Sequence, residues 1–286
     1  MIRIFYPESI YKLLNALSKH KVYVVGGFAR DMLRSGRGGE FAAVIPGKRE
    51  RYATRGESAQ TGDPLNGCNA DAAYCVQNNS NRYFNEINGS SIWSSCVALV
   101  EDDGQKSVSD IDLVTADPLE KFLPTVQKLS DNCHVVQAYQ AVQFAFEGYQ
   151  VTLTRLRYDV LCDGRQAQVE FVETLQEDVW RRDFTINALY ADEEGQVIDF
   201  VGGYQDLAAG KIRFIGDAET RIKEDLLRIL RYVRFCSLLE TPMDPDVLDL
   251  MRPYIPGLKS ISHSRLQFET KKIRKLPLGE ENLKKL

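Results

Sequence analysis

Two aspartates separated by a single residue are the first groups in this chain whose spacing suggests chemistry. Asp110 and Asp112 lie in residues 108–115, where alternating polar and apolar side chains predict a β-strand. Residues two apart on a strand point to the same face, so the two carboxylates would lie close together. Their charges repel unless a cation joins them, and Mg²⁺ prefers carboxylate oxygens and binds phosphates. The pair predicts a Mg²⁺ site for phosphoryl or nucleotidyl transfer, although a lone Asp-x-Asp more often marks a polar strand end.

A Gly-Gly dipeptide could supply a phosphate-binding turn. Residues 21–25 form a compact apolar run that predicts a buried strand, and the residues after Gly26 and Gly27 suit a helix. Glycine lets the backbone approach a ligand, and the first N–H groups of the helix would point at it. A triphosphate suits that position. Arg30, one turn into the helix, could grip phosphate or orient Asp31.

A third motif, Arg181-Arg182-Asp183, precedes an apolar stretch. Asp183 suits the cap or first turn of a helix. Arg182 could reach the sugar or triphosphate of a nucleotide, and Asn187 could hydrogen-bond the ribose. The structural alternative is that the arginines only fix helix packing.

The fourth motif is a run of charged residues spaced three apart. On a helix, Asp225, Arg228 and Arg231 would span about 120° and so share one face. Cytosine and adenine both present an amino donor beside a ring-nitrogen acceptor, so an Asp–Arg edge could pair with either and reject uracil and guanine. Arg234 would point away, to phosphate or a neighbouring helix. A surface ladder of ion pairs is the alternative.

The bulk properties restrict the class of protein. The formal net charge of −4 over 286 residues argues against nonspecific nucleic-acid binding. The six cysteines have no Cys-x-x-Cys spacing, and the sequence has neither a signal peptide nor an apolar run that could span a bilayer. We therefore expect a reduced, soluble, cytoplasmic protein with no membrane contact.

Two regions follow from the pattern along the chain. Residues 1–173 predict an α+β domain, interrupted at 37–107 by an insertion without sustained periodicity. Residues 174–286 predict an all-helical region. Its best helix covers 217–239 and is broken once near Lys223.

Together, in this order, the four motifs resemble the tRNA nucleotidyltransferase and poly(A) polymerase family of the bacterial and eukaryotic type. The resemblance implies a polymerase-β-like palm followed by a helical neck, with the C-terminal body and tail absent. Asp110 and Asp112 would be the catalytic residues and Mg²⁺ ligands. With the residues reasoned above, the nucleotide-binding set is Gly26, Gly27, Arg30, Arg182, Asp183, Asn187, Asp225, Arg228, Arg231 and Arg234.

The leading function implied by the resemblance is addition of C and A (or of one of them) to tRNA 3′ ends from CTP and ATP, without a template. A separate chain could supply the missing RNA-binding part. Poly(A) polymerase is the alternative within the same chemistry, and an inactive nucleotide-binding remnant is the alternative of another class. One departure is notable: members often carry a Glu where this chain has Gln150, and Glu170 is a loose substitute for it.

Overall fold

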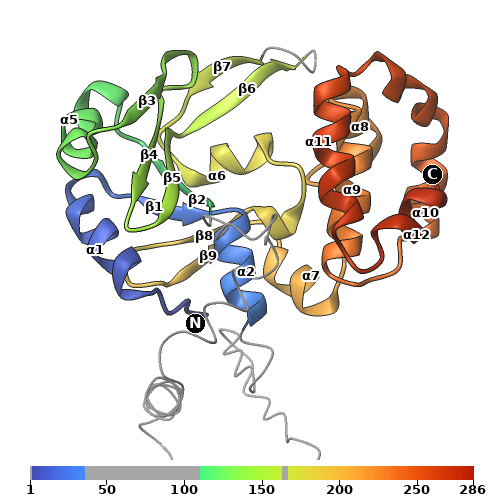
Figure 1. Ribbon diagram of the computed structural model, residues 1–286, viewed down its shortest axis with the longest axis horizontal. Coiled ribbons are helices and arrows are strands. Elements are labelled where there is room, and N and C mark those ends of the chain that lie inside the picture. Colours follow the sequence, from blue (N-terminus) through green and yellow to red (C-terminus); the bar gives the residue numbers. More distant parts are fainter. Residues whose placement is uncertain (1, 36–109, 163–166) are drawn as a thin grey trace, which may run out of the picture. The chain divides into compact units, whose positions relative to one another are not determined.

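The computed structural model describes residues 2–35, 110–162 and 167–286 (Figure 1). The insertion predicted at 37–107 therefore lies outside the described residues. The described part is a mixed α/β fold, as the sequence predicts. The boundary expected at residue 173 remains a prediction.

A seven-stranded sheet organises the first part of the fold. Its strand order is β3-β4-β5-β2-β1-β8-β9, and every neighbouring pair is antiparallel except β2 with β5. The strands are β1 (Tyr23–Val25), β2 (Asp110–Thr115), β3 (Cys133–Val136), β4 (Ala141–Phe146), β5 (Tyr149–Arg155), β8 (Leu189–Ala191) and β9 (Val197–Asp199).

Helices α1 (Glu8–Ala16) and α5 (Leu119–Leu129) form part of the core around this sheet (Figure 1). Leu13 of α1 and Phe122 of α5 have no exposed surface, and neither have Ile111 and Leu113 of β2. Because side chains alternate along a strand, burial of Ile111 and Leu113 leaves the residues between them on the opposite face. That opposite face carries Asp110 and Asp112.

A second apolar cluster holds residues 175–215 against the strands, and it includes helix α6 (Leu175–Asp178). The buried members of this cluster are Val25, Val114, Leu156, Leu175, Val179, Ala188, Tyr190 and Ile215. The segment that carries the third motif is thereby packed on the sheet.

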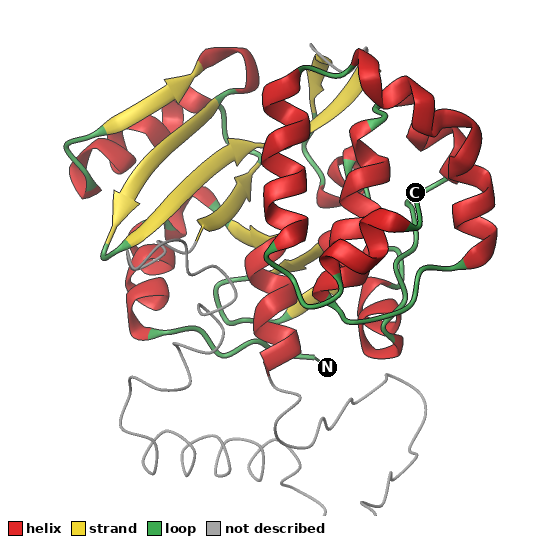
Figure 2. Cartoon of the chain, turned by 45° about the vertical axis from the view of Figure 1, so that its right-hand side comes forward, coloured by secondary structure: helices red, strands yellow, loops and turns green. Residues whose placement is uncertain are grey.

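A separate two-stranded sheet pairs β6 (Arg157–Cys162) with β7 (Ala167–Phe171). Glu170 lies on β7, opposite Tyr158. The C-terminal part is helical, and Figure 2 shows its helices gathered beside the strands. These helices are α7 (Gly203–Ala209), α8 (Ala218–Glu224), α9 (Leu227–Leu238), α10 (Pro245–Met251), a 3₁₀ segment (Arg252–Ser260), α11 (His263–Arg274) and α12 (Gly279–Lys284).

Four buried rings join the segments before and after α7 to α9. Phe184 lies 4.7 Å from Phe214 and 5.4 Å from Phe235, measured between ring centroids, and Tyr232 stacks on Phe214. Such ring pairs contribute on the order of 1 kcal/mol each beyond the area they bury. The third motif and α9 therefore belong to one packed unit.

One expectation about the second half of the chain is wrong. The region after residue 173 is not all-helical, because β8 and β9 extend the main sheet beyond β1. The segment Leu189–Ala191 is only three residues long and fully buried, so it shows no alternation of polar and apolar side chains. The single break predicted near Lys223 is confirmed, since α8 ends at Glu224 and α9 begins at Leu227.

Candidate functional site

The two aspartates of β2 lie on the same face of the sheet, and both side chains are exposed. The pKa of Asp112 is raised because neighbouring elements desolvate its carboxylate; Arg182 opposes this shift and Asp110 adds to it. Two adjacent carboxylates of which one resists ionisation form a site that a divalent cation would stabilise.

The glycine turn lies directly beside Asp112. Gly26 follows β1, has φ +73°, and ends a strand whose Val25 is paired with Asp112. A β-carbon added to Gly26 would lie 3.7 Å from Asp112 Oδ2 and 3.9 Å from Arg182 Nη1. Helix α2 (Gly27–Ser35) begins at the next residue, so its first N–H groups start at this turn. The first three motifs thus meet at Gly26.

Arg30 of α2 is buried, and its guanidinium donates hydrogen bonds to two other side chains of the protein. Its Nε and Nη2 donate to the Asp31 carboxylate at 2.7 and 2.9 Å, and its Nη1 donates to Asn187 Oδ1 at 2.7 Å. The guanidinium lies 5.1 Å from the centre of the Phe235 ring. Of the two roles open from sequence, the contact with Asp31 is the one present here.

Arg181 and Arg182 share one buried carboxylate, Asp178, at 2.6 and 2.8 Å. Burial alone would raise the pKa of Asp178, but the two guanidinium groups hold it well below its ordinary range. The Tyr190 hydroxyl also donates to Asp178, at 2.8 Å. Asp178 therefore fixes Arg182 beside the glycine turn. The sequence analysis missed it, although its spacing of three and four residues before the arginines was a usable signal.

Asp183 is buried and accepts three hydrogen bonds. Its donors are the Phe184 backbone N–H at 2.8 Å, Asn187 Nδ2 at 3.0 Å and Arg231 Nε at 2.7 Å. Burial opposes ionisation of Asp183, but Arg231 above all keeps the pKa of the carboxyl below its usual value. Asp183 does stand near a helical turn, the 3₁₀ segment Thr185–Asn187, and its main partner comes from α9.

The spacing of three predicted that Asp225 shares a helix face with the arginines of α9. This prediction is wrong. The φ of −150° and ψ of 105° of Asp225 are extended, because it occupies the break before α9. Asp225 Oδ2 accepts from Arg265 Nη2 at 2.9 Å, whereas Arg228 Nη1 donates to Glu224 Oε2 and to the Arg221 carbonyl, both at 2.6 Å. The two members of the predicted base-reading pair are thus three residues apart in sequence and bound to different partners.

Arg231 and Arg234 both approach Glu269 of α11, at 3.7 and 2.8 Å. Glu269 is 3% exposed, and the sequence offered no signal for it. Both guanidinium groups also face the ring of Phe235, at 5.6 and 4.2 Å from its centre. Arg234 therefore meets the neighbouring helix, which was one of its two predicted destinations.

A third carboxylate does not join the aspartates of β2. Glu170 lies on β7, and within residues 2–35, 110–162 and 167–286 no group of three or more acidic, histidine or cysteine side chains could hold a metal. The residue paired with Asp110 across the parallel strands is Gln150. A neutral amide thus occupies the position beside Asp110.

Parts of the chain are similar to known proteins. The family described as the Poly A polymerase head domain matches residues 103–213. Over 124 residues the chain is 45% identical to the human protein named CCA tRNA nucleotidyltransferase 1, mitochondrial, a match that covers 42% of this chain and 29% of that protein. Over 172 residues it is 36% identical to the CCA-adding enzyme of Bacillus licheniformis, with 59% of this chain and 43% of that one covered.

Residues 103–213 thus carry the head domain of the tRNA nucleotidyltransferase and poly(A) polymerase family. A solved structure of the Bacillus stearothermophilus CCA-adding enzyme in complex with CTP has the same fold, with a TM-score of 0.61 at 23% identity. That alignment covers 99% of this chain and 52% of the other. The chain spans less than half the length of the curated relatives it matches and about half that of the solved structure.

Nucleotidyltransferases of this family generally use a divalent metal ion. The donors available in this chain fit such an ion, because Asp110 and Asp112 offer carboxylate oxygens on one exposed face. As for membranes, we find no helix in the described ranges with the length and apolar character needed to cross a bilayer.

Proposed function

We propose that this chain is a template-independent RNA nucleotidyltransferase that adds C, A or both to the 3′ end of tRNA, using CTP and ATP. The observation that carries the proposal is the meeting of three motifs at Gly26. A β-carbon placed there would be 3.7 Å from an Asp112 carboxylate oxygen and 3.9 Å from an Arg182 guanidinium nitrogen. A transferase needs these three elements within the length of one triphosphate.

The reaction follows from the chemistry of the groups. The 3′-hydroxyl oxygen of the RNA forms a bond to the α-phosphorus of the nucleotide, the bond from that phosphorus to the bridging oxygen breaks, and pyrophosphate leaves. Mg²⁺ bound by Asp110 and Asp112 would neutralise charge on the phosphate oxygens and favour ionisation of the attacking hydroxyl. Gly26 and Gly27 leave room for the triphosphate against the N–H groups of α2.

Arg182 would contact the incoming nucleotide. Its guanidinium stays charged and oriented because Asp178 and the Tyr190 hydroxyl hold its Nε, leaving Nη1 toward the glycine turn. Arg30, Asp183 and Asn187 would support the nucleotide-binding surface through their mutual hydrogen bonds.

For base selection, we propose that Asp225 and Arg228 read the amino and ring-nitrogen edge shared by cytosine and adenine. Asp225 would exchange Arg265 for the amino group of the base, and Arg228 would offer a donor to the ring nitrogen. Arg231 and Arg234 would hold α9 in place through Asp183 and Glu269.

The substrates, metal and compartment of this chain are proposed from its relatives and its cysteines. The solved relatives include a CCA-adding enzyme of Thermotoga maritima complexed with tRNA, and other CCA-adding enzymes complexed with ATP and with CTP. By analogy we propose tRNA, ATP and CTP as substrates and Mg²⁺ as the metal, with a separate RNA-binding chain as a possible partner. Cytoplasm is the proposed compartment, in keeping with the free thiols of Cys133 and Cys236.

The test supplies labelled CTP, ATP, GTP or UTP and Mg²⁺ with tRNA that lacks its terminal CCA, and then with unrelated RNA. Ordered addition of C, C and A to the tRNA supports the proposal. A long A tail on unrelated RNA would indicate a poly(A) polymerase, the activity whose head domain the family match names. Retained ATP binding without any product would indicate a remnant that no longer turns over.

A further inference from the structure

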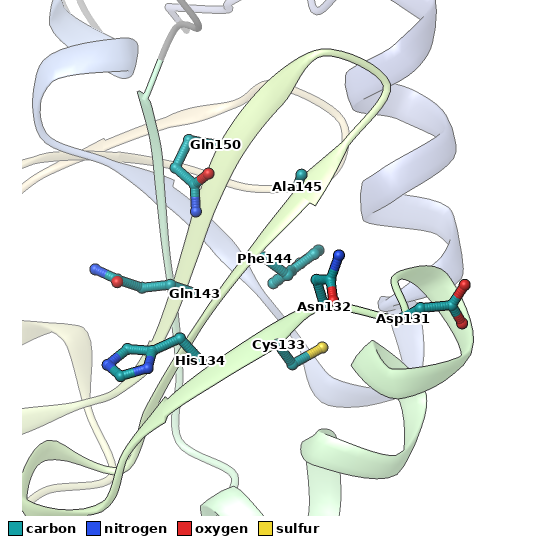
Figure 3. A pocket seen from close by; sticks show the side chains of 8 residues that line it. All are labelled: Asp131, Asn132, Cys133, His134, Gln143, Phe144, Ala145 and Gln150. Atoms are coloured by element: carbon teal, nitrogen blue, oxygen red, sulfur yellow. The ribbon is translucent and has the colours of Figure 1, made fainter.

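A hollow lies at the part of the main sheet formed by β3, β4 and the start of β5 (Figure 3). It has a volume of about 400 Å³, and its lining residues come from both faces of the strands: His134, Gln143, Ala145 and Gln150 on the face of the aspartates, Cys133 and Phe144 on the other, with Asp131 and Asn132 before β3. Pockets of roughly 300–1,000 Å³ hold small ligands in other proteins. No part of the site described above uses this hollow.

The strand register places the hollow next to Asp110. Gln150 of β5 is paired with Asp110 of β2 on one side and with Ala145 of β4 on the other. Paired residues point to the same face, so Ala145 and Gln150 extend the surface on which Asp110 lies. His134 is paired with Gln143 and continues that surface onto β3.

Figure 3 agrees with this register. The side chains of His134, Gln143 and Gln150 project to one side of the sheet, whereas Cys133 and Phe144 project to the other. The short side chain at Ala145 leaves the space between them open. The hollow therefore occurs where a small residue is surrounded by longer polar ones.

The hollow and the glycine turn flank the aspartates on opposite sides. Gly26 ends β1, which borders β2 next to Asp112, while Gln150 belongs to β5, which borders β2 next to Asp110. A triphosphate bound at Gly26 leaves the β5 side of the metal ligands for the second substrate. That substrate carries the attacking hydroxyl.

The chemistry of the lining favours an uncharged ligand with several hydrogen-bonding groups. Two amides from Gln143 and Gln150 and the imidazole of His134 can each donate and accept. Within the described part of the chain, none of these three side chains has a hydrogen-bond partner, so all remain available. No Lys or Arg lines the hollow, so it offers no cationic partner to a triphosphate.

We propose that this hollow binds the 3′-terminal nucleoside of the acceptor RNA, through its ribose hydroxyls and base edge, and so delivers the 3′-hydroxyl to Asp110. The inference rests on the proposed function, because it assigns the second substrate of the same reaction to a place. Gln143 and His134 would contact the base or ribose away from the reacting atoms, and Gln150 would lie nearest to them.

The experiment compares variants on the two faces of the same strands. Ala145→Leu fills the hollow, and the double variant His134→Ala with Gln143→Ala removes donors and acceptors. Val135→Ala is the matched control, since Val135 is also exposed but follows His134 on β3 and points to the opposite face. Circular dichroism and thermal unfolding check that each variant folds.

Two affinities are measured for each full-length variant. Fluorescence anisotropy gives the Kd for a tRNA that lacks its terminal A and ends in a 3′-deoxynucleotide, and calorimetry gives the Kd for ATP. We expect both hollow variants to weaken RNA binding about tenfold, the loss of one or two hydrogen bonds, and to change ATP binding less than twofold. Val135→Ala should match the unmodified chain in both.

If the unmodified chain extends tRNA but the hollow variants bind RNA as Val135→Ala does, the inference is overturned and the proposed function stands. Weakened ATP binding in Ala145→Leu would also overturn it, because the hollow would then belong to the nucleotide. A chain that neither binds nor extends tRNA would overturn the inference and the proposed function together.

Discussion

Arg231 donates from Nε to Asp183 Oδ2 at 2.7 Å, across 48 residues of sequence. Asp183 also accepts from Asn187, which accepts from Arg30 of α2. On the other side, Arg231 approaches Glu269 of α11 at 3.7 Å. This line of hydrogen bonds and ion pairs joins the helix after the glycine turn to the helix that would read the base.

Breaking this line should destabilise the fold. Asp183→Asn removes the nearer charge partner of Arg231 while keeping the side-chain shape, and it leaves a half-buried guanidinium with only the Glu269 carboxylate at 3.7 Å. We expect a loss of about 3 kcal/mol in the free energy of unfolding, measured in urea. Asp249→Asn is the control, because its ion pair with Arg252 is largely exposed and should contribute little. Equal stabilities of the two variants would contradict the role given to Asp183.

The buried carboxylate of Asp178 should make stability depend on pH. Its pKa in the folded protein lies below the unfolded value of about 3.9, so its ion pairs stabilise the fold above about pH 4 and are lost as pH falls through the folded pKa. Asp178→Asn should therefore lower the free energy of unfolding by about 3 kcal/mol at pH 7, and by less as the pH approaches 3. Urea titrations at several pH values check this. A difference that stays constant down to pH 3 would contradict it.

The two aspartates of β2 should be required for transfer but not for folding. Replacing both Asp110 and Asp112 by Ala removes exposed side chains, so the thermal midpoint should change little, while the rate should fall roughly a thousandfold or more. Mn²⁺ binding, followed by electron paramagnetic resonance, should be lost in the same variant. Glu120→Gln on α5 is the control and should keep both properties. Transfer by the double variant would remove the metal assignment.

Gly26 and Gly216 allow conformational strain to be separated from ligand contact. Both have positive φ, +73° and +81°, and a β-carbon meets nothing within 4 Å at Gly216. Gly→Ala at either position should cost about 1–2 kcal/mol of stability. Only Gly26→Ala places a methyl group beside Asp112 and Arg182, so only this variant should also weaken ATP binding, measured by calorimetry. Weakening of the same size in Gly216→Ala would mean that strain alone is responsible.

Asp225 should affect the choice of nucleotide more than the rate. Asp225→Ala removes the acceptor for the amino group of cytosine or adenine, so incorporation of UTP and GTP should rise about tenfold relative to CTP and ATP. Arg265→Ala breaks the same ion pair but leaves the Asp225 carboxylate in place, so it should keep the selectivity. The ratio of kcat/KM values for the four nucleotides is the measurement. Identical selectivity in the two variants would contradict base reading by Asp225.

Strand alternation and turn chemistry were enough to predict the features that depend on residues close together in sequence. The alternation around Ile111 predicts that Asp110 and Asp112 share a face, and the Gly-Gly turn predicts where α2 begins; the structure agrees on both. The insertion at 37–107 and the assigned roles of the site residues remain predictions. The prediction that Asp225 lies on the arginine face of α9 was wrong. A spacing of three places residues on one helix face only if the helix is continuous, and here the helix breaks at Asp225.

The sequence by itself determined the family, the order of its motifs and the sheet face that carries the two carboxylates, because each depends on residues a few positions apart. Only the tertiary structure decided that Gly26, Asp112 and Arg182 lie close together. It also decided that Glu269 forms ion pairs with the arginines of α9 and that Gln150 lies beside Asp110. These contacts depend on which strands become neighbours and how helices pack on them. Burial of many apolar side chains at once sets that arrangement, and no local spacing records it.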